Sequence, residues 1–303
     1  MEQSTITNHM SDLGWRDFLA LCKPKIVAMI VFTAMVGMFL STPGMIPLDA
    51  FLFGSIGIGL AAASAAAINH IVDEKIDSVM MRTSRRPLPK GKLSTQSAII
   101  FAAFLCLLSM LVLGLLVNVL TAILTLLSLV GYGFIYSMYL KRATPQNIVI
   151  GGAAGAAPPV LGWSAISGTL DPSSLLLFLI IFAWTPPHFW ALAIYRRNDY
   201  AKANIPMLPV THGVEFTRLH ILLYTLVLFV VTLLPYITLM SGLTYLIGAV
   251  ALGGWFLYYA IRMQKDHSDH LAMKTFSFSI VYLLALFAFL LVDHYIPVLL
   301  GYS

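Results

Sequence analysis

Long apolar stretches, separated by short polar connections, follow one another along most of this 303-residue chain. A helix needs about 20 apolar residues to cross the hydrocarbon core of a bilayer, and the pattern predicts nine such helices. They cover residues 25–41, 50–70, 95–114, 118–139, 147–166, 173–195, 217–238, 241–261 and 276–298. We therefore expect an all-α integral membrane protein: a polar N-terminal segment (1–20), then one nine-helix transmembrane bundle (21–303).

The basic residues lie on one side of the predicted spans. All 18 Lys and Arg residues occur before the first span or in the connections after the second, fourth, sixth and eighth. The other connections, near 42–49, 115–117, 167–172 and 239–240, contain none. Because basic loops stay in the cytoplasm, this alternation predicts a cytoplasmic N-terminus and an outside C-terminus.

Composition supports the same class and narrows the partners. Hydrophobic residues make up 59% of the chain and charged residues only 10%, which excludes an ordinary soluble domain. The net charge of +5 does not indicate nucleic-acid binding, because the positive charge follows the orientation pattern of a membrane protein. A lipid bilayer is therefore the expected surrounding, and no nucleic-acid partner is expected.

Acidic and amide side chains recur at helical spacing where the second predicted span ends. Asn69, Asp73 and Asp77 are four residues apart, so one helix face would carry all three. Such oxygen ligands suit a hard cation such as Mg²⁺. Two carboxylates one turn apart also repel each other, and a divalent cation would remove that cost. The alternative is that Lys75 or Arg82 neutralises the pair.

A second polar cluster follows the sixth predicted span. Asp199 lies there beside Arg196, on the same predicted side of the membrane as the first cluster. A third basic patch, Lys141 with Arg142, lies on that side too. Cationic side chains bind phosphate oxygens, so the three clusters together suggest a metal–diphosphate site that faces the cytoplasm.

These motifs resemble those of the UbiA superfamily of intramembrane prenyltransferases, which has nine spans and two aspartate-rich motifs. Asn69, Asp73 and Asp77 match the first motif, N-x-x-x-D-x-x-x-D, at every named position. The second motif usually has paired aspartates. Here Asp199 is present, but Ala203 occupies the position four residues later.

Four longer segments are similar to one branch of that superfamily, whose members farnesylate haem. They are 77–88, 141–152, 185–192 and 199–210. The resemblance implies transfer of farnesyl from farnesyl diphosphate to a vinyl group of haem B. Water adds a hydroxyl, and the products are haem O and diphosphate, for biogenesis of terminal haem–copper oxidases. It also implies a bacterial inner membrane location and contact with haem A synthase or a haem–copper oxidase.

The resemblance also assigns roles to individual side chains. The implied ligands of Mg²⁺, which also form the catalytic centre, are Asn69, Asp73, Asp77 and Asp199. The implied diphosphate-binding residues are Arg82, Arg86, Lys141, Arg142 and Arg196. For haem, His188 is the first candidate because it follows two prolines inside the sixth span, where an opened helix exposes a cavity. His212 is the second.

Three other functions remain open from the sequence. A prenyltransferase with a quinone-precursor or chlorophyllide acceptor would have the same first motif, and only the segments outside it favour haem. A secondary transporter would place its polar groups at the midplane on broken helices, whereas these clusters lie at one face. A non-catalytic oxidase assembly factor would not need an intact metal motif.

Overall fold

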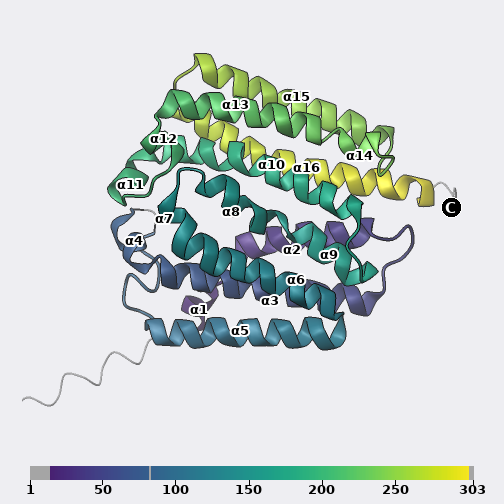
Figure 1. Cartoon of the computed structure of the whole chain (residues 1–303), viewed down its shortest axis with the longest axis horizontal. Coiled ribbons are helices and arrows are strands. Elements are labelled where there is room, and N and C mark those ends of the chain that lie inside the picture. Colours follow the sequence, from purple (N-terminus) through teal and green to yellow (C-terminus); the bar gives the residue numbers. More distant parts are fainter. Residues whose placement is uncertain (1–13, 82, 300–303) are drawn as a thin grey trace, which may run out of the picture.

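The computed structural model describes residues 14–81 and 83–299, which form a bundle of helices with no strand among them (Figure 1). The elements are α1 (Trp15–Leu21), α2 (Pro24–Leu40), α3 (Leu48–Val72), α4 (Glu74–Val79), α5 (Thr95–Leu116), α6 (Val119–Val130), η1 (Gly131–Leu140), α7 (Lys141–Ala143), α8 (Asn147–Ala156), α9 (Pro158–Ser167), α10 (Pro172–Tyr195), α11 (Arg197–Lys202), α12 (Leu208–Thr211), α13 (Val214–Val231), α14 (Leu234–Ile237), α15 (Leu243–Lys265) and α16 (Asp269–Leu299). The element η1 is a π-helix.

Eight helical segments of the described chain are long and apolar enough to cross a membrane. A ninth is obtained if α1 and α2, which meet at an angle of 52°, form one bent span. Several predicted spans consist of two consecutive helices, such as α6 with η1 and α8 with α9. The chain is thus a multi-pass integral membrane protein, while the count of nine and the orientation of the termini remain predictions.

Small residues allow the helices to pack closely, as is usual where helices associate in lipid. A Cβ atom placed on Gly162 of α9 would lie 1.9 Å from the carbonyl oxygen of Ala34 in α2. At Gly37 of α2, a Cβ would lie 2.1 Å from the carbonyl oxygen of Pro159. The backbones of α2 and α9 therefore touch, and only glycine fits at these two positions.

Hydroxyl groups join α3 to α5 in a similar way. The Ser64 hydroxyl donates to the carbonyl oxygen of Ala102 (2.8 Å), and the Ser109 hydroxyl to that of Gly57 (2.7 Å). All four residues lie within the helical spans, where no water is available to replace these bonds. These contacts fix α3, which carries the first polar motif at its end.

Several short helices gather at one end of the bundle. In Figure 1, α13 and α15 lie along one edge, α5 lies along the opposite edge, and α10 runs between them. The short helices α4, α7, α11 and α12 all lie at the end where α3, η1 and α10 terminate. The polar clusters predicted from the sequence therefore meet at this end.

Candidate active site

The first motif lies where α3 breaks into α4. Asp73 separates the two helices with φ −88° and ψ 0°, so the predicted continuous helix is interrupted at its central ligand. The exposed fractions are 5% for Asn69, 2% for Asp73 and 3% for Asp77. The Asn69 amide nitrogen donates to Asp73 Oδ2 (3.0 Å), which holds these two side chains together. Buried polar groups of this kind need partners.

The partners are cations from three other parts of the chain. Lys141 Nζ lies 2.5 Å from Asp73 Oδ2. Arg86 forms an ion pair with Asp77, and Lys23 donates to the amide oxygen of Asn69. The pair of carboxylates is therefore neutralised, but by Lys141 and Arg86. Of the two neutralising residues considered from the sequence, Lys75 is exposed on α4 and Arg82 lies outside the described residues.

The π-helix η1 positions one of these cations. Its wider turn brings the Ser137 hydroxyl to the carbonyl oxygen of Tyr132, five residues earlier (2.9 Å). The same hydroxyl oxygen accepts a hydrogen bond from the Asn69 amide (3.2 Å). One turn later, Lys141 meets Asp73. Stretches of π-helix often mark functional sites. This one aligns Ser137 with Asn69 and the following Lys141 with Asp73.

Lys23 was not among the candidates from the sequence, which indicated only an orientation signal before the first span. It lies in the short break between α1 and α2, with a left-handed backbone (φ 50°, ψ 61°). Burial and the nearby charges of Arg86 and Lys141 lower its pKa to about 7, although the Asp73 and Asp77 carboxylates oppose that shift. The contact between Lys23 and Asn69 forms because the chain breaks at this position and packs against the end of α3. The sequence does not show that break.

The second cluster lies at the same end of the bundle but does not join the first in one ligand set. Asp199 in α11 is 3.7 Å from Arg196. The described part of the chain contains no group of three or more His, Cys, Asp or Glu side chains placed to hold a metal ion. Ile76 of α4 and Tyr200 of α11 nevertheless pack on the same buried apolar cluster.

The two remaining arginines of the predicted diphosphate set differ in their surroundings. The Nε atom of Arg196 is buried and has no hydrogen-bond partner. Arg142 is exposed and donates to the carbonyl oxygen of Val72 at the end of α3 (3.3 Å). Arg196 therefore has a donor available for an anion, whereas Arg142 caps a helix.

The first motif fits a hard divalent cation. Asp73 Oδ1 is buried and has no hydrogen-bond partner, so one carboxylate oxygen is available. Asp77 and Asn69 add a carboxylate and an amide oxygen, which are the ligand types that Mg²⁺ prefers. Both ring nitrogens of the adjacent His70 are also buried without a partner. Such unmatched buried groups require an explanation, and a bound ion or its waters would supply one.

The two histidines proposed for haem have contrasting positions. His188 in α10 is 7% exposed, and its Nδ1 is 2.6 Å from the Ser279 hydroxyl of α16. Its ring lies between Trp184 and Phe276, with centroid distances of 4.2 and 4.6 Å. His212, after α12, is exposed and stacks on Phe216. His188 is therefore held in the core, while His212 is accessible.

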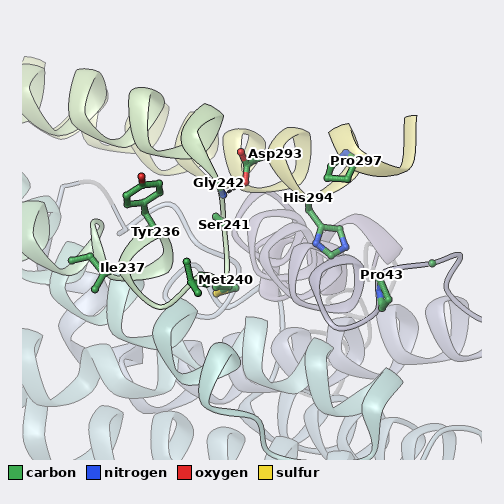
Figure 2. A pocket seen from close by; sticks show the side chains of 11 residues that line it. Pro43, Tyr236, Ile237, Met240, Ser241, Gly242, Asp293, His294 and Pro297 are labelled. Carbon is green, nitrogen blue, oxygen red and sulfur yellow. Dashed lines mark hydrogen bonds between the residues drawn. The ribbon is translucent and has the colours of Figure 1, made fainter. Parts of the chain in front are cut away.

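A cavity of about 870 Å³ lies at the opposite end of the bundle, where α2, α14 and α16 end (Figure 2). Its polar side chains already serve the fold. Asp293 accepts hydrogen bonds from the backbone of Gly242 (2.5 Å) and Tyr245 (3.2 Å), and His294 bonds to the carbonyl oxygen of Thr42 (3.0 Å). This cavity is remote from the polar motif, so it is not the candidate active site.

Buried carboxylates paired with cations at the end of an apolar helix bundle mark a candidate functional site in a membrane protein. Comparison with known proteins identifies the class. The profile of the UbiA prenyltransferase family matches residues 30–297, and the chain belongs to that family. This confirms the family expected from the first motif.

Curated relatives are more specific. A protein from Nitrosococcus oceani named protoheme IX farnesyltransferase is 63% identical, over 94% of this chain and 95% of that protein. A protein of the same name from Methylococcus capsulatus is 60% identical, over the same shares of the two chains. Both relatives bear the name of the haem-farnesylating branch. This confirms the branch expected from the four longer segments.

Solved structures show the same fold at low sequence identity. A structure described as digeranylgeranylglyceryl phosphate synthase superposes with a TM-score of 0.78 at 20% identity, over 92% of this chain and 98% of that one. A UbiA homologue from Archaeoglobus fulgidus bound to GPP and Mg²⁺ gives 0.60 at 18% identity, over 90% and 99%. That homologue therefore binds a divalent metal together with GPP.

Proposed function

We propose that this chain transfers the farnesyl group of farnesyl diphosphate to a vinyl group of haem B, giving haem O and diphosphate. The observation that carries the donor half is the buried Asn69–Asp73–Asp77 motif with its three cations. The acceptor half is supported by the name of relatives that are about 60% identical over nearly the full chain.

The ligands of Mg²⁺ in this proposal are Asn69, Asp73 and Asp77. Asp199, which lies outside this ligand set in the structure, would join them when metal and diphosphate are bound. When bound, the metal stabilises the negative charge that develops on the departing diphosphate. The buried Asp73 Oδ1, which lacks a partner, supports this role for the first motif. Few protein oxygens suffice, since Mg²⁺ keeps several waters and shares its shell with substrate phosphates.

The cations of the site bind the diphosphate. Lys141 and Arg86 are already placed at the carboxylates, and Arg196 has a buried Nε donor without a partner. Arg142 and Arg82 complete the proposed set. Lys141, Arg86 and Arg196 stabilise the leaving anion because their donors are positioned before the reaction begins.

Besides farnesyl diphosphate and haem B, the reaction consumes only one water molecule. The bond between farnesyl C1 and the diphosphate oxygen breaks, and its electron pair stays with the diphosphate. The π-electrons of the haem vinyl group then form a bond to farnesyl C1. Water attacks the cationic vinyl carbon that results, leaves a hydroxyl there and releases a proton. An apolar interior keeps other water from quenching the farnesyl cation.

Aromatic side chains are proposed to stabilise the carbocation, and two histidines are proposed to bind haem. Tyr132 and Tyr136 of η1 stack on each other, with ring centroids 5.4 Å apart, beside the Ser137 that contacts Asn69. Their π-faces can stabilise a cation. For haem we propose His188, whose Nδ1 is fixed by Ser279, with exposed His212 as a contact near the entrance.

The proposal places the protein in a bacterial inner membrane with its site facing the cytoplasm. The one-sided distribution of basic residues supports this orientation. Haem A synthase and a haem–copper oxidase are the partner classes that follow, because one would consume haem O and the other would contain the final cofactor.

Purified protein tests the function directly. Incubation with farnesyl diphosphate, haem B and Mg²⁺ should give a product with the mass of haem plus a farnesyl group plus a hydroxyl group. Parallel reactions with a hydroxybenzoate, a naphthoate and chlorophyllide test the alternative acceptors. Farnesylation of one of those, with none of haem, would reject the haem assignment but keep the prenyltransferase.

A further inference from the structure

One residue of α16, Ser279, contacts both the buried histidine of α10 and a ring that stacks on it. Its hydroxyl oxygen lies 2.6 Å from His188 Nδ1, although the two residues are 91 positions apart in the chain. Its carbonyl oxygen accepts a hydrogen bond from Trp184 Nε1 (2.8 Å). Ser279 is completely buried, so no water can take over these bonds. The position of the imidazole ring therefore depends on this serine.

The direction of the bond between Ser279 and His188 follows from counting protons. A serine hydroxyl has a single proton to donate. The Ser279 hydroxyl oxygen lies 2.6 Å from the carbonyl oxygen of Phe276, which can only accept. Two oxygen atoms come this close when a proton lies between them, so the hydroxyl donates to Phe276. It must then accept from His188, and the Nδ1 atom of His188 carries a proton.

The second ring nitrogen of His188 is consequently the one with a lone pair. None of the ion pairs in the described chain includes His188. Because burying an unpaired charge is costly, the ring is neutral. A neutral imidazole with a proton on Nδ1 has its lone pair on Nε2. Among the described residues Nε2 has no hydrogen-bond partner, and it is not one of the fully enclosed polar atoms.

An imidazole held in this way is prepared to bind a metal. Histidines that bind metals usually donate a hydrogen bond from the other ring nitrogen, which fixes both the tautomer and the orientation of the ring. The geometry points to Ser279 as a positioning residue of the acceptor site: its hydroxyl keeps His188 in the Nδ1–H tautomer and leaves Nε2 free for the haem iron. This inference rests on the proposed function and adds Ser279 to it.

The tautomer can be measured on the full chain without haem. Nitrogen NMR of protein labelled with ¹⁵N-histidine distinguishes a ring nitrogen that carries a proton from one that does not. His188→Phe identifies the His188 signals by their loss. Wild-type protein should show a proton on Nδ1 and none on Nε2. In Ser279→Ala no acceptor selects this tautomer, so both ring nitrogens should show partial protonation.

A haem titration of the same proteins in detergent, followed by absorbance, measures the consequence. Ser279→Ala should bind haem about 10- to 100-fold more weakly, which is the usual effect of removing the partner of a metal-binding histidine. Thr275→Val is the matched control. Its hydroxyl is also buried on α16, one turn earlier, and donates to the carbonyl oxygen of Leu271 (2.9 Å). That variant should change neither the tautomer of His188 nor the haem affinity.

The outcomes separate this inference from the proposed function. A proton on Nε2 in wild-type protein would overturn the inference, whatever the protein catalyses. Wild-type haem affinity in Ser279→Ala, in a chain that does farnesylate haem, would overturn the role of Ser279 and keep the function. Wild-type protein that neither binds nor farnesylates haem would overturn the acceptor assignment, and the inference with it.

A second variant covers the case in which Ser279→Ala does not fold. Ser279→Thr keeps the hydroxyl, so the Nδ1–H tautomer should persist and the haem affinity should stay within about threefold of wild type. A folded Ser279→Thr protein with the proton on Nε2 and unchanged haem affinity would contradict the inference. The measurement on wild-type protein needs no change at Ser279 and tests the tautomer in either case.

Discussion

Lys141 Nζ lies 2.5 Å from Asp73 Oδ2, although the two residues are 68 positions apart in the chain. Ser137 and Asn69, separated by the same 68 positions, form the contact one turn earlier. The ends of α3 and η1 therefore run in parallel register, and two successive pairs join them. This register places a cation on the central carboxylate of the motif.

Replacing Lys141 should impair both catalysis and stability. Lys141→Met leaves the Asp73 carboxylate buried and unpaired, with only 3% of its side chain exposed. Breaking a buried pair in this way costs about 3 to 5 kcal/mol. Thermal unfolding in EDTA should therefore occur at a lower temperature, and Mg²⁺ should restore part of the loss. Turnover should fall about 100-fold, because a donor to the leaving diphosphate is missing.

Lys75→Met is the matched control for that variant, because Lys75 is exposed on α4 and carries the same charge. Its turnover and melting temperature should equal those of wild type. An equal loss in both variants would show that overall charge at this end of the bundle, rather than the pair with Asp73, is responsible.

Asp73→Asn should abolish metal-dependent turnover without preventing insertion into the membrane. The amide cannot supply the charge that holds a divalent cation, and we expect a decrease of about 100- to 1000-fold in kcat. Product formation over a series of Mg²⁺ concentrations gives the measurement. Glu74→Gln changes the next residue, whose side chain accepts an exposed hydrogen bond from the Thr95 hydroxyl. If that control lost as much activity, Asp73 would have no special role.

Ligands should stabilise the folded protein in a defined order. Mg²⁺ with pyrophosphate, at 100 times its dissociation constant, should raise the free energy of unfolding by about 2.7 kcal/mol. Pyrophosphate in EDTA should have little effect, because Lys141 and Arg86 stay paired with the two carboxylates until a metal replaces them. Thermal melts under the four conditions (neither, either, both) test this, and stabilisation by pyrophosphate alone would argue against a metal-dependent site.

Close packing between α2 and α9 should make one glycine indispensable. Gly162→Ala places a Cβ 1.9 Å from the Ala34 carbonyl oxygen, so the two helices must separate. Overpacking of this kind costs about 1 to 3 kcal/mol, and the melting temperature should fall. Gly114→Ala in α5 is the control, since a Cβ there meets nothing within 4 Å. Equal destabilisation of both variants would exclude steric contact as the cause.

His188→Phe should separate the acceptor site from the donor site. If His188 binds haem, haem titration followed by absorbance should show about tenfold weaker binding. Binding of pyrophosphate with Mg²⁺ should stay the same, because the ring packs on Trp184, Phe189 and Phe276 and bonds to Ser279, away from the first motif. His267→Phe, at an exposed position, should change neither. Unaltered haem affinity in His188→Phe would leave His188 a packing residue.

The spans and the first motif were predictable because both depend on local pattern. Apolar length determines where a helix can cross a bilayer, and α3, α5, α10 and α15 lie close to the predicted stretches. The motif was found because its spacing follows one helix face. The break at Asp73 was missed, since no glycine or proline marks it.

The partners of the motif could not be predicted, because they depend on three-dimensional packing. Lys23 contacts Asn69, which is 46 positions away in the chain. The left-handed backbone at Lys23 was not predictable, because glycine or asparagine usually marks that conformation and neither occurs there. The π-helix at Gly131–Leu140 has an ordinary apolar sequence. His188 was selected as a haem-binding residue and stays a prediction. Its enclosure by Trp184 and Phe276 could not be foreseen without knowing where α16 packs.

The parallel register of α3 and η1 also bears on how the protein assembles during synthesis. Lys23, Asn69, Asp73, Asp77, Arg86 and Lys141 all precede α8, so the cluster draws only on the first half of the chain. A nascent chain that has inserted as far as α7 already carries the counter-charges for its own carboxylates. The newly inserted half therefore does not expose unpaired acidic groups to lipid while it waits for α10 and α11, which bring the remaining elements of the site.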